Sequence, residues 1–189
     1  MKSLIIVSHP NKNSFSVSGI AKTIQDELRN NKTEYYLLDL YRENLSLDFG
    51  KDKVREYQEL ITWADNVYFI SPVWWFRMTP LLEAFFDQIF TPGFAYKFVP
   101  LTKFYGYPKP LLKDKKVRTY LTHGAPALPV MTLYLNSVKL RLVMGVYSFV
   151  FGWFKTKTRQ FWSVPFISQN DRMIILEKIR NEVRKDLSR

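Results

Sequence analysis

The sequence predicts an α/β protein in which a parallel β-sheet carries helices on both faces. Five expected strands, of which the first is nearly continuously apolar as in a parallel sheet, alternate with segments whose apolar residues recur at helical spacing. Such strand–helix alternation builds a sheet covered on both sides. The length of 189 residues suits one compact domain, and no repeat, low-complexity tract or linker divides residues 1–189.

Residues 3–8 are nearly continuously apolar, as in a parallel sheet, and residues 67–70 form a short apolar run. Five strands are expected, the last from a segment that can supply a strand. They occupy residues 3–8, 35–40, 67–70, 117–122 and 156–164. With the strand order 2-1-3-4-5, the loops after strands one, three and four converge where the order reverses, which is where ligands of open α/β sheets bind.

The expected helices follow these strands, and the first carries its apolar residues on one face, with Ser14 or Ser16 as N-cap. The others cover residues 51–63, 81–90, 131–151 and 171–187, the last capped by Ser168 or Asn170. Residues 91–113 contain four prolines and two glycines, so we expect a long irregular loop there. A loop of that length is uncommon unless it serves a function.

Composition excludes several classes of protein. Cysteine is absent, which rules out disulfides, thiolate metal sites and cysteine nucleophiles and favours a reducing, cytoplasmic location. The N-terminus lacks the pattern of a signal peptide. The most apolar segment, residues 142–154, has 13 uncharged residues, fewer than the roughly 18 of a membrane span, so we expect a buried or partner-facing helix.

The net charge is +11, from 28 basic and 17 acidic residues. Such an excess attracts phosphates, anionic cofactors, nucleic acid or acidic membrane surfaces, and a merely solvated surface is the alternative. No nucleic-acid-binding motif accompanies the basic residues, so we expect no nucleic-acid partner. A peripheral membrane or transporter contact fits the charge.

Aromatic residues fill the loop after the third strand, where polar residues are usual. Trp74, Trp75 and Phe76 follow Pro72 and Val73 there. At the ligand-binding edge of the sheet these rings suggest a wall for a flat, conjugated ligand. Alternatively they plug the top of the core, since aromatic side chains favour burial.

The loop after the first strand has no glycine, so it contains neither a dinucleotide-binding nor a P-loop motif. Asn13, Ser14 and Ser16 nevertheless stand at a helix N-terminus, where free N–H groups and the helix dipole favour a phosphate. The same serines also suit simple capping.

The two histidines of the chain, His9 and His123, both end strands at the expected crevice. Further metal ligands at defined spacing are missing, so we expect no metal. A G-x-S-x-G nucleophile motif is also missing, which argues against a Ser-His-Asp hydrolase. Hydrogen bonding to a phosphate or a ring is the better role for the histidines, with a structural role as the alternative.

Four motifs carry a resemblance to a known family. They are Ser8-His9-Pro10 with Asn13-Ser14-Phe15-Ser16, Pro72-Val73-Trp74-Trp75-Phe76 with Pro80, Phe90-Thr91-Pro92-Gly93-Phe94-Ala95-Tyr96, and Thr122-His123-Gly124-Ala125. Over nearly its whole length the chain resembles the flavodoxin-like NAD(P)H:quinone oxidoreductases. That family includes the mammalian quinone reductase, bacterial modulators of drug activity and the ancillary subunits of potassium-efflux systems. The resemblance implies a flavodoxin-like three-layer sandwich.

The resemblance also implies a flavin at the crevice, with NAD(P)H as co-substrate and a quinone or similar flat acceptor. FAD is favoured and FMN is the alternative. The implied cofactor-binding residues are His9, Asn13, Ser14, Phe15, Ser16, Pro72, Val73, Trp74, Trp75, Phe76, Thr122, His123, Gly124 and Ala125. The implied substrate pocket adds Tyr96 and Phe98 to Trp75, Phe76 and His123. Family members are typically homodimers, for which residues 142–154 would be a natural contact.

One departure leaves the catalytic side chains unassigned. The mammalian enzyme uses a Tyr and a His in the loop after the fourth strand, and residues 128–133 offer neither. A second reading of the chain is a flavin-fold regulatory subunit of a membrane transporter, a role that the basic surface and the apolar helix would suit. A flavodoxin-type electron carrier fits less well, because such carriers are usually acidic.

Overall fold

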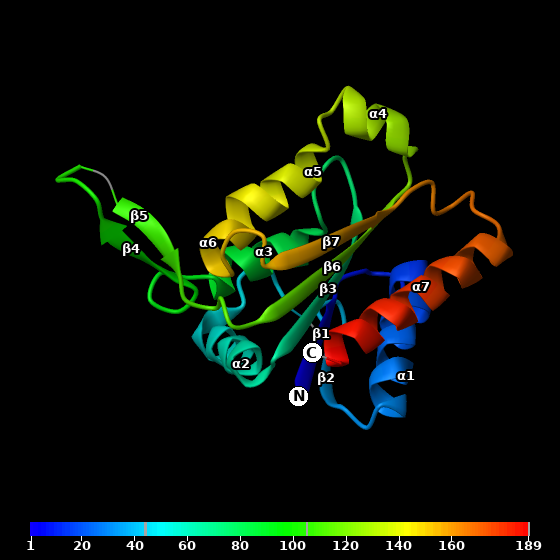
Figure 1. The fold of residues 1–189 in the computed structure, drawn as a ribbon, viewed down its shortest axis with the longest axis horizontal. Helices are drawn as coiled ribbons and strands as arrows, with labels where there is room; N and C mark the ends of the chain where they lie inside the picture. Colours follow the sequence, from blue (N-terminus) through cyan, green and yellow to red (C-terminus); the bar gives the residue numbers. More distant parts are fainter. Residues whose placement is uncertain (44, 105, 189) are drawn as a thin grey trace.

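The computed structural model describes residues 1–43, 45–104 and 106–188. Within these ranges, five parallel strands form a sheet in the order β2-β1-β3-β6-β7, which is the predicted order 2-1-3-4-5 once the strands of the sheet are counted along the chain (Figure 1). The strands are β1 (Lys2–Val7), β2 (Glu34–Asp39), β3 (Asn66–Val73), β6 (Lys116–His123) and β7 (Thr156–Phe161).

The sheet separates two apolar cores, because alternate residues of a strand face opposite sides. Ile5 and Val7 of β1 pack beneath α1 (Lys22–Asn30) and α7 (Gln169–Leu187). Leu4 and Ile6 contribute to the core on the other side, which also includes buried residues of α2 (Gly50–Trp63), α3 (Pro80–Ile89) and the helical run after residue 136. The predicted three-layer sandwich is confirmed (Figure 1). Among the described helices, none combines the length and the apolar character that crossing a membrane requires.

The first helix begins where its cap was expected. The Oγ of Ser14 accepts a hydrogen bond from the N–H of Val17 at 3.3 Å. A π-helix, η1 (Phe15–Ala21), follows and continues into α1. Ser16, the alternative cap, is instead buried, with its Oγ 3.1 Å from Oγ1 of Thr122 on β6. Ser168 caps α7 in the same way as Ser14 caps the first helix.

The single helix predicted for residues 131–151 is wrong. The structure has α4 (Ala127–Thr132), a reversal, and then α5 (Ser137–Leu140), η2 (Arg141–Tyr147) and α6 (Ser148–Val150) in one run. Leu135 and Asn136 take positive φ angles of 50° and 48°, and the N–H of Asn136 donates to the carbonyl of Val130. Asn tolerates this left-handed conformation, so the helix can break at Asn136. The apolar residues on both sides continue at helical spacing, and for this reason the sequence pattern does not show the break.

Residues 91–113 are also not the irregular loop that the sequence suggested. They contain an antiparallel hairpin of β4 (Tyr96–Pro100) and β5 (Gly106–Pro110), which projects from the body of the molecule (Figure 1). Prolines fit a two-stranded ribbon because each strand has an outer edge whose N–H groups need no ladder partner. The predicted fifth strand, 156–164, ends at Phe161, shortly before Ser163 takes a positive φ of 52°.

Candidate functional site

A cavity of about 830 Å³ lies where β1, β3 and β6 end, at the expected crevice. Its volume is in the usual range for small-molecule and cofactor sites. All fourteen residues that the resemblance implied for cofactor binding line it: His9, Asn13, Ser14, Phe15, Ser16, Pro72, Val73, Trp74, Trp75, Phe76, Thr122, His123, Gly124 and Ala125. Sequence reasoning missed Asn11, Val130, Val164, Pro165 and Arg172.

One end of the cavity is the N-terminus of the η1–α1 helix. Ser14 caps it, and the N–H groups of Phe15 and Ser16 have no acceptor among the described residues. The loop before the cap is held by its own hydrogen bonds, because Asn11 donates its N–H to Nδ1 of His9 and accepts from the N–H of Asn13. Free N–H groups at the positive end of a helix dipole form an anion site.

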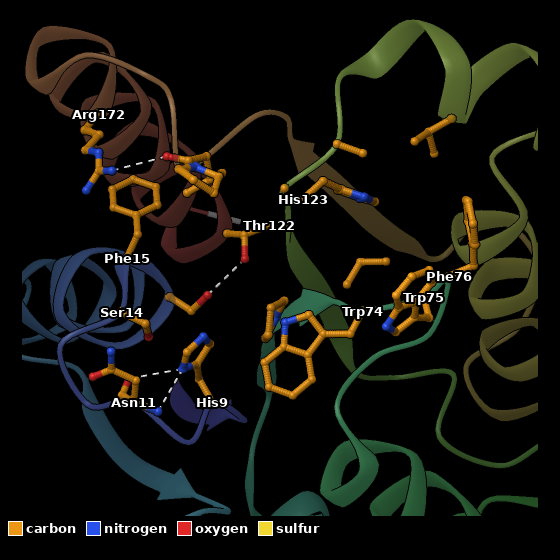
Figure 2. Close-up of a pocket in the computed structure, with 18 of the residues that line it drawn as sticks. His9, Asn11, Ser14, Phe15, Trp74, Trp75, Phe76, Thr122, His123 and Arg172 are labelled. Atoms are coloured by element: carbon orange, nitrogen blue, oxygen red, sulfur yellow. Dashed lines mark hydrogen bonds between the residues drawn. The ribbon is translucent and has the colours of Figure 1, made fainter.

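Arg172, in the first turn of α7, adds positive charge to this end of the cavity (Figure 2). Its Cζ lies 5.5 Å from the centre of the Phe15 ring, and its Nη2 donates to the carbonyl of Val164 at 3.2 Å. It has no acidic partner in the described part of the chain. A cation in the first turn of a helix is unfavourable because it opposes the helix dipole. This unusual position of Arg172 is the one sequence feature that could have pointed to the residue.

The opposite wall is a tight turn in which Trp74 and Arg77 exchange two main-chain hydrogen bonds of 2.8 and 3.0 Å. Between them, Trp75 and Phe76 take positive φ angles of 48° and 60°. Glycine and asparagine usually fill such turns, and for other residues the conformation costs about 1–3 kcal/mol each. The N–H groups of Trp75 and Phe76 have no acceptor among the residues described, so this costly turn leaves two donors free.

The rings of this turn lie differently from one another. Trp74 meets the ring of His9 edge-on at 5.8 Å, and Phe76 packs on Tyr134 at 4.4 Å. Trp75 has 92% of its surface exposed. The alternative that these rings plug the core therefore fails for Trp75, whose side chain stands at the rim of the cavity (Figure 2).

His123 lies between the two ends of the cavity, at the end of β6 (Figure 2). Its side chain is 3% exposed and its ring packs on Trp162 at 4.2 Å. Burial lowers the pKa of His123 to about 4, so the imidazole is neutral at physiological pH. Its Nε2 is buried without a hydrogen-bond partner among the described residues, an arrangement that is costly in a folded protein.

Tyr96 and Phe98 do not line this cavity. They stand next to each other on β4, with ring centres 5.5 Å apart, in the projecting hairpin. The residues described also include no group of three His, Asp or Glu side chains that could hold a metal ion.

Comparisons with known proteins agree with this architecture. Residues 1–139 match a family described by its flavodoxin-like fold. An uncharacterized NAD(P)H oxidoreductase of Haemophilus influenzae is 26% identical over 137 residues. The match covers 66% of this chain and 65% of that relative, so the chain spans less than two thirds of the relative's length.

Two solved structures show the same fold. The NAD(P)H:quinone oxidoreductase from Methanothermobacter marburgensis has a TM-score of 0.78 at 22% identity, covering 100% of this chain and 98% of that one. The FMN-dependent NADH-azoreductase from Bacillus anthracis, solved with FMN, has a TM-score of 0.74 at 14% identity, covering 97% and 98%. The matched residues include all four motifs, and the family match confirms the resemblance: this chain belongs to the family with the flavodoxin-like fold.

Proposed function

We propose that this protein is a flavin-dependent NAD(P)H oxidoreductase that passes reducing equivalents to a quinone or a similar flat acceptor, from a single flavin-binding domain over residues 1–189. One observation carries the proposal. A single cavity joins an anion site at a helix N-terminus, a wall of aromatic rings with free N–H donors, and a buried neutral histidine. The relative from H. influenzae, named an NAD(P)H oxidoreductase, supports it.

The residues of the cavity fit a flavin. Its phosphate would lie at the free N–H groups of Phe15 and Ser16, beside Arg172. Its ring would lie along Pro72–Phe76, with Thr122–Ala125 on the other side. The unpartnered donors at Trp75 and Phe76 suit the polar edge of such a ring, because buried polar groups need partners.

A bound flavin supplies hydride transfer between a nicotinamide and an acceptor, and the protein supplies position and electrostatics. The N–H groups of Trp75 and Phe76 would stabilise negative charge that develops on the ring, because preorganised dipoles need no rearrangement during the reaction. The rings of Trp75 and Phe76 would orient flat co-substrates and exclude water. His123 stays neutral and so can hydrogen-bond without adding charge.

We put FMN before FAD as the cofactor. The motifs of the sequence resemble the FAD-using branch of the family, whereas the structurally similar azoreductase from B. anthracis was solved with FMN. In the described residues that line the cavity, the groups suited to a phosphate gather in one cluster around Ser14 and Arg172, as one phosphate requires. Chromatography of the flavin released from the purified protein distinguishes the two.

We also propose that the chain forms a homodimer. Tyr96 and Phe98 lie outside the cavity of their own chain, so they can line a substrate pocket only if a hairpin reaches a second copy. Multi-angle light scattering should then give twice the mass of 22.5 kDa. A mass of one chain at micromolar concentration would contradict this part of the proposal.

Flavin titration of Arg172→Ala tests the proposed site directly. Charge-assisted hydrogen bonds contribute about 1.5–3 kcal/mol, so we expect the dissociation constant to rise at least about tenfold. Arg180→Ala, on the same helix but outside the cavity, is the matched control and should leave it unchanged. Equal effects of the two variants, or no flavin binding by the wild-type chain, would contradict the proposed function and favour the regulatory-subunit reading.

A further inference from the structure

The positive charge of this chain is concentrated in one stretch. Residues 88–170 contain 12 of the 28 basic residues but only one of the 17 acidic ones, Asp114. The remaining residues hold 16 of each sign, so the whole net charge of +11 comes from this stretch. It forms the β4–β5 hairpin, β6, the helical run from α4 to α6, and β7 (Figure 1).

Part of this charge is used inside the fold, and part is free. Arg118, Arg159 and Lys157 pair with carboxylates of α7, and Arg141 pairs with Glu83. Six lysines are exposed and have no acidic partner among the residues the structure describes: Lys97, Lys103, Lys109, Lys113, Lys139 and Lys155. Three of the six belong to residues 96–110, which contain no acidic residue.

The hairpin has two different faces, because residues opposite each other in an antiparallel pair lie on the same side. Tyr96 and Phe98 share one face with their partners Pro110 and Pro108. The other face carries the pairs Lys97–Lys109 and Val99–Tyr107. The loop after α6 lies against this second face, since Nε1 of Trp153 donates to the hydroxyl of Tyr107 at 3.1 Å.

Large apolar side chains are exposed in the same segments as these lysines, and Nζ of Lys103 lies 5.8 Å from the centre of the Phe104 ring. Phe104 near the hairpin tip is 92% exposed and Phe154 is 96% exposed, and Leu101 is also exposed. We call the following set the hairpin surface: Lys97, Leu101, Lys103, Phe104, Lys109, Trp153, Phe154 and Lys155. Exposed apolar side chains of this size are a liability in water unless a partner covers them.

We propose that the hairpin surface binds an anionic lipid bilayer, with its lysines at the headgroups and Leu101, Phe104 and Phe154 inserted at the interface. Each lysine near an anionic membrane contributes to binding, and aromatic rings favour the headgroup level. A second copy fits the surface poorly, because two such surfaces would repel. A nucleic acid would use the lysines but would leave the leucine unused. A dimer contact through Tyr96 and Phe98 would use the opposite face of the hairpin and leave Lys97 and Lys109 free. Of the contact 142–154 expected from the sequence, Trp153 and Phe154 belong to the hairpin surface instead.

Co-sedimentation of the full chain with vesicles tests this inference, whether or not flavin is bound. The vesicles contain phosphatidylcholine with or without phosphatidylglycerol. We expect binding only to the anionic vesicles, and weaker binding at high salt because salt screens exposed charges. Lys97→Glu with Lys109→Glu should lower the partition coefficient at least about tenfold. Phe104→Ser should weaken the binding that survives high salt.

The matched control is Lys22→Glu with Lys51→Glu, which changes the net charge equally at two exposed lysines outside the charged stretch. It should retain wild-type binding, and circular dichroism should show all variants folded. Equal losses in both double variants would mean that total charge alone acts and would overturn the proposal. A wild-type chain that does not bind anionic vesicles would also overturn the proposal. The same holds if the chain binds a DNA oligonucleotide more tightly than vesicles and Phe104→Ser does not change its affinity for DNA.

Discussion

Ser14 has two roles that can be separated at the level of a single residue. Its Oγ caps the first helix by accepting from the N–H of Val17, and its position places it beside the proposed phosphate site. Asp and Asn are both good N-caps, but only Asp brings a negative charge. A pair of substitutions can therefore keep the fold and change only the electrostatics.

Ser14→Asp should raise the dissociation constant for flavin on the order of tenfold, because its carboxylate would repel the phosphate and neutralise the positive end of the helix dipole, whose interaction with a charge is worth up to about 2 kcal/mol in partly buried sites. Ser14→Asn keeps the cap without charge and should bind flavin nearly as the wild type does. Fluorescence titration measures both. Equal affinities of the Asp and Asn variants would place the phosphate elsewhere.

His123 makes stability depend on pH. Its pKa is about 4 in the folded chain against a usual value of 6.5, since burial disfavours the charged ring. Between these values the unfolded chain binds more protons, so the free energy of unfolding should fall as the pH drops from about 6.5 to about 4. Urea unfolding at pH 7 and pH 5 measures this fall.

His123→Phe keeps a ring against Trp162 and removes the titrating group, so the variant should lose less stability over this range than the wild type. Burial also lowers the pKa of His9, which acts in the same direction in both proteins and leaves the difference to His123. Parallel pH dependences would show that His123 is not held neutral by the fold.

Among the elements, the Trp74–Arg77 turn holds two residues at unfavourable positive φ angles beside the proposed flavin. Trp75→Gly relieves the positive φ of 48°, whereas Trp75→Ala does not, and both remove the exposed ring. We expect the Gly variant to be more stable than the Ala variant by about 1 kcal/mol. Both should lose turnover to the same degree, as calorimetry and NAD(P)H oxidation assays can check. Turnover that follows melting temperature across the two variants would contradict a role of Trp75 in the site.

Helix α7 is held to the sheet by charges. Arg118 on β6 binds Asp186 through Nε at 2.6 Å and Nη2 at 2.7 Å, and Glu182 through Nη1 at 3.2 Å, all nearly buried. Arg118→Leu removes the most buried partner of both carboxylates, which keep only the more exposed Lys157 and Arg159, and should cost about 3 kcal/mol of unfolding free energy. Arg180→Leu breaks the exposed pair with Glu177 and should cost less than about 1 kcal/mol. Denaturant unfolding compares them, and similar costs would contradict a central role for the buried cluster.

The sequence predicted the elements that face the core and missed those that do not. Strands such as β1 are buried on both faces, so their apolar runs are unambiguous. The reversal at Asn136 and the β4–β5 hairpin depend on left-handed φ angles and on edge pairing, which apolar periodicity does not report. The exposed Leu133 and Leu135 continue the apolar pattern past the end of α4.

In the molecule as a whole, the residues that line the cavity were easier to predict from the sequence than the residues of the hairpin surface. The fourteen cavity residues follow from strand order together with four motifs, because loops at one edge of a parallel sheet must meet. Arg172 reaches the cavity from the last helix and has no motif around it. The sequence shows the concentration of charge in residues 88–170, but it does not show that the hairpin projects from the molecule with Phe104 exposed (Figure 1). The proposed membrane surface could therefore not be predicted from the sequence.

We propose that this cavity holds a flavin that NAD(P)H reduces. The most direct measurement is the visible absorption spectrum of the purified protein, saturated with FMN, before and after anaerobic NADPH and then a quinone. We predict a flavin band that NADPH bleaches and the quinone restores. A protein that binds neither FMN nor FAD, or whose bound flavin NADPH does not bleach, would contradict the account.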